Sequence, residues 1–182
     1  MPNQSPLVSF RAKLLQPATP EDAAWSFLLV PAGASAKLST RGMISVEGTF
    51  AGQPLKAKLE PDGQGSHWLK VPRALREAAG AAVGDTVALA IAPVAEQPRP
   101  RVPADLRKAF AAKTDAHARW TDLTPVARRD WIEWITSAKK PETRTRRISS
   151  TCDMLVSGKR RVCCFDRSGI YSKGFRAPQA AE

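Results

Sequence analysis

The chain has 182 residues, 43% of them hydrophobic, which suits one ordinary domain or two small ones with packed cores. Its 28 Lys and Arg against 17 Asp and Glu give a net charge of +11. No apolar run reaches the roughly 18 to 20 residues that span a bilayer, and the N-terminus lacks a cationic segment followed by an apolar core. We therefore expect no transmembrane segment, no secretory leader and a cytoplasmic location.

The positive charge is unevenly distributed along the chain. Residues 1–100 contain 10 basic and 8 acidic side chains, whereas residues 101–182 contain 18 and 9. This asymmetry suggests an anionic partner for the second half, whether nucleic acid, acidic lipid or an acidic protein surface. A basic surface that only keeps the protein soluble fits the same numbers.

The cysteines and histidines predict neither disulfides nor a metal site. Cys152, Cys163 and Cys164 cannot all pair internally, and adjacent cysteines rarely bond to each other, so we expect reduced thiols. Their spacing matches no zinc-ligand pattern, and His67 and His117 lie far from them in the sequence. We expect no metal and no cofactor.

The first half of the chain is a series of short, alternating or apolar segments typical of β-strands. Two of them end at prolines, Pro31 and Pro72, and a short Gly-containing turn at residues 51–54 predicts a hairpin. The expected strands cover residues 8–15, 25–30, 42–50, 55–61, 67–72 and 87–91.

A short helix and an internal repeat are also predicted in this half. The run RALREAAG follows Pro72 and stops at Gly80, and the next segment opens with a Gly-Asp turn. The stretch from Trp25 to Val46 is echoed by the stretch from Trp68 to Val87. Two units related in this way commonly close on each other as a small barrel, which removes exposed strand edges.

The run VPRALREAAGAAVGDTVALAI resembles the looped-hinge hairpin of AbrB-like transition-state regulators and MazE-type antitoxins, which form double-split β-barrels. Together with WSFLLVP and GTFAGQPLKAKLEPDGQGSHWLKV, it is more similar to the bacterial barrel domain of unknown function that precedes a helical YdeI or OmpD-associated domain. The resemblance implies a barrel at residues 8–94. DNA binding does not follow from it, because the basic residues alternate with acids: Lys56, Lys58, Lys70, Arg73 and Arg76 among Glu60, Glu77 and Asp85.

The second half predicts a linker and three to four helices. Residues 95–102 form a Pro-rich linker, and helical periodicity covers residues 103–158. The clearest helix has Thr124 as its N-cap and carries Trp131 and Trp134 on its buried stripe, so we expect both tryptophans in the core. His117 is expected to be a partly exposed helix residue without a catalytic role. The fold class is therefore α+β: a small N-terminal double-split-type β-barrel followed by a C-terminal helical domain.

A dense basic cluster surrounds the start of the last predicted helix, at Pro141. Free amides at a helix N-terminus, placed among fixed cations, can bind an anion. A solvated basic face paired to acids of the barrel is the other interpretation of the same cluster. The candidate residues for binding an anion or partner are Lys139, Lys140, Arg144, Arg146 and Arg147.

The strings LTPVARRDWIEWI and AKKPETRTRRI, after a Pro-Ala-Asp-Leu opening, resemble the bacteriocin-protection, YdeI or OmpD-associated family. This resemblance covers residues 102–158 and assigns a helical domain at residues 103–158. It implies bacterial proteins linked to envelope stress and to resistance against bacteriocins or antimicrobial peptides, with no catalytic residues to transfer. Residues 159–182 depart from the pattern as a basic tail, which we expect to be mobile beyond about Arg167.

The sequence favours a binding protein over an enzyme. It offers no nucleophile with a base, no paired acids and no Gly-rich phosphate loop at informative spacing. The leading hypothesis is a non-catalytic protein of the YdeI/OmpD-associated type whose partner is an acidic protein or a small anion. The alternative is a nucleic-acid-binding regulator that uses the AbrB-like barrel and the basic helices. The oligomeric state is left open by the sequence.

Overall fold

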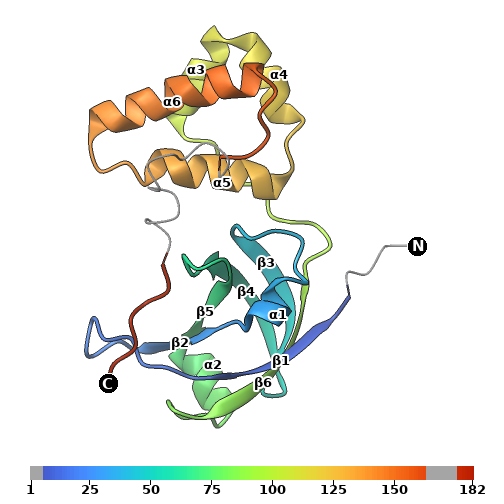
Figure 1. The fold of residues 1–182 in the computed structure, drawn as a ribbon, viewed down its shortest axis with the longest axis vertical. Coiled ribbons are helices and arrows are strands. Elements are labelled where there is room, and N and C mark those ends of the chain that lie inside the picture. Colours follow the sequence, from blue (N-terminus) through green and yellow to red (C-terminus); the bar gives the residue numbers. More distant parts are fainter. Residues whose placement is uncertain (1–5, 163–175) are drawn as a thin grey trace. The chain divides into compact units, whose positions relative to one another are not determined.

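The computed structural model describes residues 6–162 and 176–182, and its secondary structure is α+β as predicted (Figure 1). The chain divides into two compact units. The first comprises Met1–Gln97 with Phe175–Glu182, and the second comprises Pro98–Gly174. Each unit has a hydrophobic core of its own.

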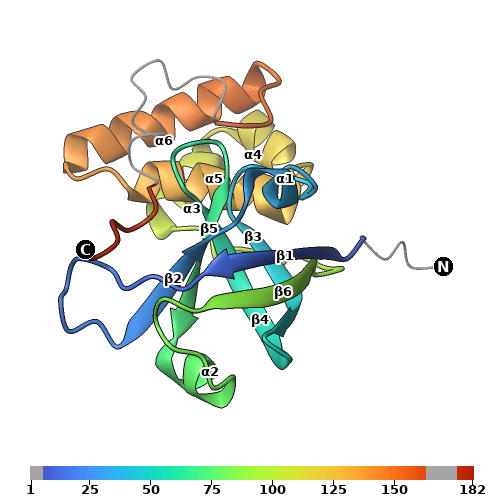
Figure 2. The same ribbon diagram turned by 60° about the horizontal axis from the view of Figure 1, so that its bottom comes forward.

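The first unit is built on a six-stranded antiparallel sheet in the order β1-β6-β3-β4-β5-β2. The outermost strands of this order are β1 and β2. Leu15, two residues beyond the end of β1, forms a bridge with Phe27 of β2, so the sheet curls into a barrel (Figure 2). Inward-facing Val, Leu, Ile and Phe side chains fill the interior. The strands are β1 Val8–Lys13, β2 Trp25–Leu29, β3 Ile44–Phe50, β4 Gln53–Pro61, β5 His67–Pro72 and β6 Thr86–Pro93.

The strand order has the symmetry of a repeat. One half is β1-β2-α1-β3 and the other is β4-β5-α2-β6, where α1 is Ala32–Ser35 and α2 is Arg73–Ala78. The corresponding strands of the two halves are β1 and β4, β2 and β5, and β3 and β6. When each strand is exchanged for its counterpart, the β1–β6 pair becomes the β4–β3 pair, and the β2–β5 and β3–β6 pairs are unchanged. Each helix follows a proline, Pro31 or Pro72, which explains the echo in the sequence. The sequence predicted α2 but not α1.

The β3–β4 hairpin is tighter than the predicted turn at residues 51–54. Its two turn residues are Ala51 and Gly52, with φ of 45° and 83°, the positive values that a two-residue hairpin turn requires. Within β3, Gly48 approaches β6 so closely that a Cβ atom would stand 2.0 Å from the carbonyl oxygen of Ala90. A side chain at this position would therefore collide with the backbone of the neighbouring strand.

Two further segments are fixed to the barrel. In the predicted linker, the Gln97 side chain accepts from the backbone N–H of Ser45 at 2.9 Å and donates to the Ser45 carbonyl at 2.8 Å. At the C-terminus, the N–H of Ala181 donates to the Gln16 carbonyl at 2.8 Å, and Gln179 accepts from Ala18 at 2.8 Å. The end of the predicted tail is thus hydrogen-bonded to the first unit. Residues 163–175 of that tail lie outside the described residues.

The second unit contains four helices within its described residues: α3 Ala104–Ala112, α4 Thr114–Thr121, α5 Pro125–Thr136 and α6 Pro141–Val156. This agrees with the three to four helices predicted from periodicity. The core of the unit consists mainly of large apolar side chains from all four helices, including Leu106, Phe110, Trp120, Trp131, Ile135, Ile148 and Leu155.

Candidate functional site

The predicted basic cluster lies at the connection between α5 and α6. Thr124 caps α5 as expected, its hydroxyl oxygen accepting from the backbone N–H of Ala127 at 3.2 Å. The helix ends at Thr136 and α6 begins at Pro141, so the connection spans only residues 137–140. Carbonyl groups at the end of α5 and amide groups at the start of α6 are the two sets of backbone groups that need partners here.

Arg147 is the most deeply buried member of the cluster, with 6% of its surface exposed. Its Nη1 donates to the carbonyl oxygen of Trp134 and to the hydroxyl of Ser137, the latter at 3.1 Å. The guanidinium also lies 5.2 Å from the centre of the Trp134 ring, a cation–π distance. Arg147 therefore satisfies a carbonyl at the end of α5 and holds α5 against α6.

Arg144 is engaged in a two-pronged ion pair with Asp105 in the first turn of α3. The Nε–Oδ2 and Nη2–Oδ1 distances are 2.6 and 3.1 Å. The hydrogen bonds raise the pKa of Arg144 and lower the pKa of Asp105. At the other end of these helices, Lys113 Nζ lies 2.6 Å from Asp153 Oδ1. Because the first turn of α3 pairs with the first turn of α6, and the end of α3 pairs with the last turn of α6, the two helices run parallel.

Lys139, Lys140 and Arg146 are the remaining predicted residues, and all three are exposed. Their side chains form no hydrogen bond or ion pair with any residue in the described part of the chain. The five predicted residues thus divide into two that hold helices together and three that are available to a partner. The prediction that these residues bind an anion stays a prediction, and two of them, Arg144 and Arg147, already have partners within the helical unit.

The tryptophans of α5 have the structural role that the sequence predicted. Trp131 is fully buried, and its Nε1 donates to the carbonyl of Arg160 at 3.3 Å. Trp134 packs against the same core, its ring centre 6.1 Å from that of Trp131. His117 is exposed and lies beside Phe110, with ring centres 5.6 Å apart.

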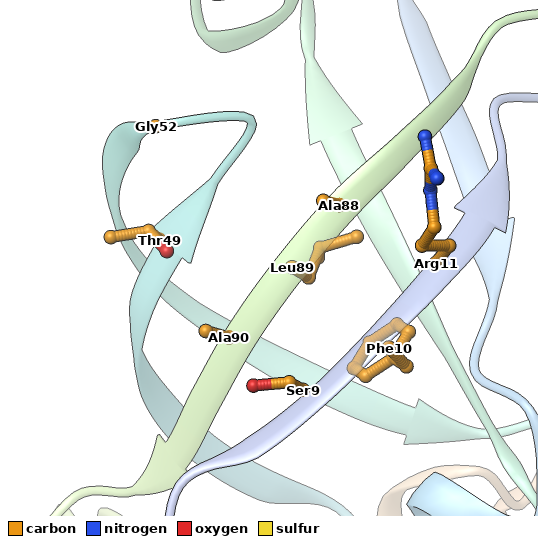
Figure 3. Close-up of a pocket in the computed structure, with 8 residues that line it drawn as sticks. All are labelled: Ser9, Phe10, Arg11, Thr49, Gly52, Ala88, Leu89 and Ala90. Carbon is orange, nitrogen blue, oxygen red and sulfur yellow. The ribbon is translucent and has the colours of Figure 1, made fainter.

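Two of the surface hollows formed by the described residues lie in the first unit. One, of about 450 Å³, is formed by β1, β6 and the tip of the β3–β4 hairpin (Figure 3). Its outward side chains are mostly small, and the charged one is Arg11. A shallow depression of this kind offers a ligand few directed contacts.

The other hollow, of about 440 Å³, lies between β4, β5 and α2. Lys56, Lys58, Lys70 and Glu60 line it together with apolar side chains. The Lys70 ammonium lies 4.5 Å from the centre of the Trp25 ring. Sequence reasoning missed this grouping, since the lysines alternate with other residues until pairing of β4 with β5 brings them together.

The comparison with protein families separates the chain at the same place as its fold. Residues 99–158, in the helical unit, match the family described as Bacteriocin-protection, YdeI or OmpD-Associated. The helical unit therefore carries a domain of this family. Residues 10–91, in the barrel, match the domain of unknown function DUF1905. Both predicted resemblances to these domains are confirmed, and the comparison with curated proteins finds no match.

The barrel contains a Ser–His pair that sequence reasoning also missed. The Ser35 hydroxyl lies 2.6 Å from His67 Nδ1, and His67 Nε2 lies 2.9 Å from the carbonyl oxygen of Gly42. A hydroxyl that donates to a histidine resembles an activated nucleophile. However, Ser35 is 3% and His67 0% exposed, so no substrate can reach them. The pair instead ties α1 and the segment after it to β5.

Burial also determines the protonation of this histidine. It lowers the pKa of His67, an effect larger than the opposing one of the bond to Gly42. The carbonyl of Gly42 can only accept, so the neutral ring carries its proton on Nε2 and receives the Ser35 hydroxyl at Nδ1. A protonated ring would have no acceptor for Nδ1 other than that hydroxyl.

The described residues contain one free cysteine and no cluster of potential metal ligands. Across residues 6–162 and 176–182, no three His, Cys, Asp or Glu side chains gather as a metal site would require. Cys152 is a buried free thiol whose pKa is raised by burial, and Cys163 and Cys164 lie outside the described residues. Among the helices in these stretches, none combines the length and apolar character that a bilayer crossing requires.

Proposed function

We propose that this protein is a non-catalytic binding protein whose helical unit binds an anionic partner, an acidic protein or a small anion. The observation that carries the proposal is the separation of charge between the units. The first unit has 10 basic and 9 acidic residues, whereas the second has 18 and 8. The family description supports a role in protection against bacteriocins, and we extend this to envelope stress.

The exposed side chains of the helical unit sharpen this charge argument. Several of its cations serve the fold, including Lys113, Arg144 and Arg147. Other cations are exposed and form no ion pair or side-chain hydrogen bond within the described residues: Arg99, Arg101, Arg107, Lys108, Arg119, Lys139, Lys140 and Arg146. By the same criterion only the acids Asp115, Asp122 and Glu142 are left within those residues. The helical unit therefore has more exposed, unpaired cations than acids among its described residues, and these cations are available to a partner.

Lys139, Lys140 and Arg146 are the preferred contacts within this set. Lys140 is the N-cap residue of α6 and Lys139 precedes it, so both flank the amide groups that open a 16-residue helix. The helix dipole adds positive potential at that end. Arg146 follows within the first two turns of α6.

The test compares two triple variants of the full chain. Lys139→Gln, Lys140→Gln and Arg146→Gln remove three charges from the helical unit, and Lys13→Gln, Lys37→Gln and Arg41→Gln remove three exposed charges from the barrel. Thermal unfolding is measured in sulfate and in chloride at equal ionic strength. A bound anion stabilises the folded state by mass action, so the first variant should lose about half or more of the sulfate-specific rise in Tm. Equal stabilisation of both variants would contradict the proposal.

Binding to nucleic acid is the alternative that the same charge allows. It predicts weak association with random duplex DNA or RNA whose affinity falls steeply with salt, because phosphate contacts release counterions. Filter binding or fluorescence anisotropy over a salt series measures this directly. Association that the helical triple variant weakens would favour the alternative, and undetectable binding at low salt would remove it.

A further inference from the structure

The fourth strand of the barrel lacks a partner along one edge. β4 pairs with β3 from Gln53 to Leu59, but with β5 only at residues 59–61. Residues 53–58 thus have a neighbouring strand on one side only, within the part of the chain that the structure describes. The hollow of about 440 Å³ lies where β4 and β5 diverge.

The strand register identifies the backbone groups on this open edge. Phe50 and Gln53 flank a two-residue turn and form a hydrogen-bonded pair. The backbone N–H and C=O groups of Gln53, and of every second residue after it in β4, therefore point toward β3. The backbone groups of Lys56 and Lys58 then face the open side. Ser45 of β3 agrees with this alternation. It lies opposite Lys58, and its own N–H and carbonyl point away from β4 and bond to the Gln97 side chain.

Pro54 is on the same open side and lacks an N–H group. Proline is tolerated in strands where its missing donor would face away from a partner strand. Its presence in β4 therefore agrees with an edge that no strand of the barrel covers.

The side chains around this edge select a particular kind of strand. Lys56 and Lys58 project from β4, and Lys70 projects from β5 on the opposite wall. Leu55 and Leu75 provide an apolar floor. Lys56 and Lys58 have acidic neighbours, Glu47 at 3.7 Å and Glu60 at 3.2 Å, but these are exposed pairs of the kind that contribute little and exchange easily.

We propose that this groove is a strand-addition site for an extended, acidic segment of a partner protein. The segment would bond to the backbone groups of Lys56 and Lys58 and extend the sheet beyond β4. Side chains of a strand alternate between two faces, so small apolar residues would contact the Leu55 and Leu75 floor and acidic residues would contact the lysines. The recognised sequence is therefore an alternation of small apolar and acidic residues.

Protection of the edge is the competing explanation, because lysine and proline on an edge strand discourage pairing with other chains. That explanation accounts for Pro54, Lys56 and Lys58, which are on the edge itself. It does not account for Lys70, which is on the facing wall with its ammonium over Trp25. Cations on both walls exclude basic strands and attract acidic ones.

The first experiment uses the full chain and a fluorescent (Glu-Val)₄ peptide. Fluorescence polarisation at low salt should show saturable binding, and amide NMR signals of Lys56 and Lys58 should shift. A peptide with the same composition in two blocks tests alternation, and a (Lys-Val)₄ peptide tests charge. A (Glu-Val)₄ peptide N-methylated at alternate residues keeps the charges but loses the donors of one edge, and it should bind at least roughly tenfold more weakly.

Variants of the barrel separate the contacts. Lys56→Gln, Lys58→Gln and Lys70→Gln together should raise the Kd roughly tenfold, as expected for three exposed charge contacts. The variant Lys13→Gln, Lys37→Gln and Arg41→Gln removes the same charge elsewhere on the barrel and should not change the Kd. Lys56→Pro should weaken binding more than Lys56→Gln, because it also removes a backbone donor from the open edge.

Three outcomes would overturn the proposal. They are no binding of the alternating peptide at low salt, equal binding of the N-methylated peptide, and preference of the three lysines for single-stranded nucleic acid over the peptide. The site does not depend on the anion partner proposed for the helical unit. The variant of Lys139, Lys140 and Arg146 should therefore bind the peptide normally, so the two proposals can fail separately.

Discussion

The two units use their polar groups in opposite ways. In the helical unit, basic side chains are part of the fold: Arg144 pairs with Asp105 of α3, and Arg147 joins α6 to α5. In the barrel, backbone hydrogen bonds between paired strands hold the elements together, and the outward lysines lie on the surface. A high density of cations in a sequence is therefore a poor guide to a binding site unless their partners are known.

The units also differ in which groups they leave without a partner in the described structure. The helical unit leaves charged side chains, which suit an anion of little defined shape. The barrel leaves a strand edge, which suits a partner of defined backbone geometry. We therefore expect weak, salt-sensitive binding at the charged side chains of the helical unit, and sequence-dependent binding at the strand edge of the barrel.

The largest expected effect tests the claim that backbone packing determines the barrel. A Cβ at Gly48 would lie 2.0 Å from the Ala90 carbonyl oxygen, and both groups belong to paired strands that cannot separate locally. We expect Gly48→Ala to lower the free energy of unfolding of the barrel by about 4 kcal/mol or more. Urea unfolding followed by NMR signals from each unit measures this, and the helical unit should keep its transition.

Gly33→Ala is the matched control for this change. Gly33 lies in α1 with open space around its Cα, and alanine is the better helix former. The free energy of unfolding of the Gly33→Ala variant should be unchanged or raised by up to about 1 kcal/mol. Equal stability of the two variants would show that β3 and β6 are not in the close contact described here.

The second effect tests whether a predicted binding residue is a structural one. Arg147→Met keeps an apolar stem but removes the charged donor to the Trp134 carbonyl, which retains the Ser137 hydroxyl at 3.0 Å, and removes the cation from the ring face. We expect a loss of about 2 to 3 kcal/mol in the free energy of unfolding of the helical unit. Arg146→Met, one residue earlier and exposed, should change it by less than about 0.5 kcal/mol. Similar losses for both variants would contradict the assignment of Arg147 to the fold.

Much of the fold could be predicted because local signals agreed with the tertiary structure. Thr124 and Pro125 opened α5, prolines closed two strands, and helical spacing placed Trp131 in the core. The helix α1 was missed because four residues are too few to show a periodicity.

The candidate site was harder to predict, since its interactions join distant parts of the chain. Arg144 meets Asp105 across 39 positions, and no local pattern indicates this pairing. The groove depends on where β4 and β5 diverge, which is a property of strand register and not of composition. Both pairings depend on tertiary contacts that the spacing of basic residues along the sequence does not show.

The smallest of these effects concerns pH and distinguishes the barrel from the helical unit. His67 is buried in its neutral form with its pKa lowered, whereas the unfolded chain titrates near its ordinary value of about 6.5. Stability that depends on neutral His67 is therefore complete above that value and is lost as the pH falls toward the lowered folded-state pKa. Between pH 7 and 5.5 the barrel should therefore lose stability, by at most about 1 kcal/mol.

Urea unfolding of the barrel at a series of pH values tests this dependence. His67→Gln lacks the titrating ring and should remove most of the change between pH 7 and 5.5, whatever its effect on stability at pH 7. His117→Gln, at the exposed histidine of α4, should leave the change in place. A pH dependence that persists in His67→Gln would mean that another group carries it. The Ser35–His67–Gly42 connection would then contribute to stability without making the barrel sensitive to pH.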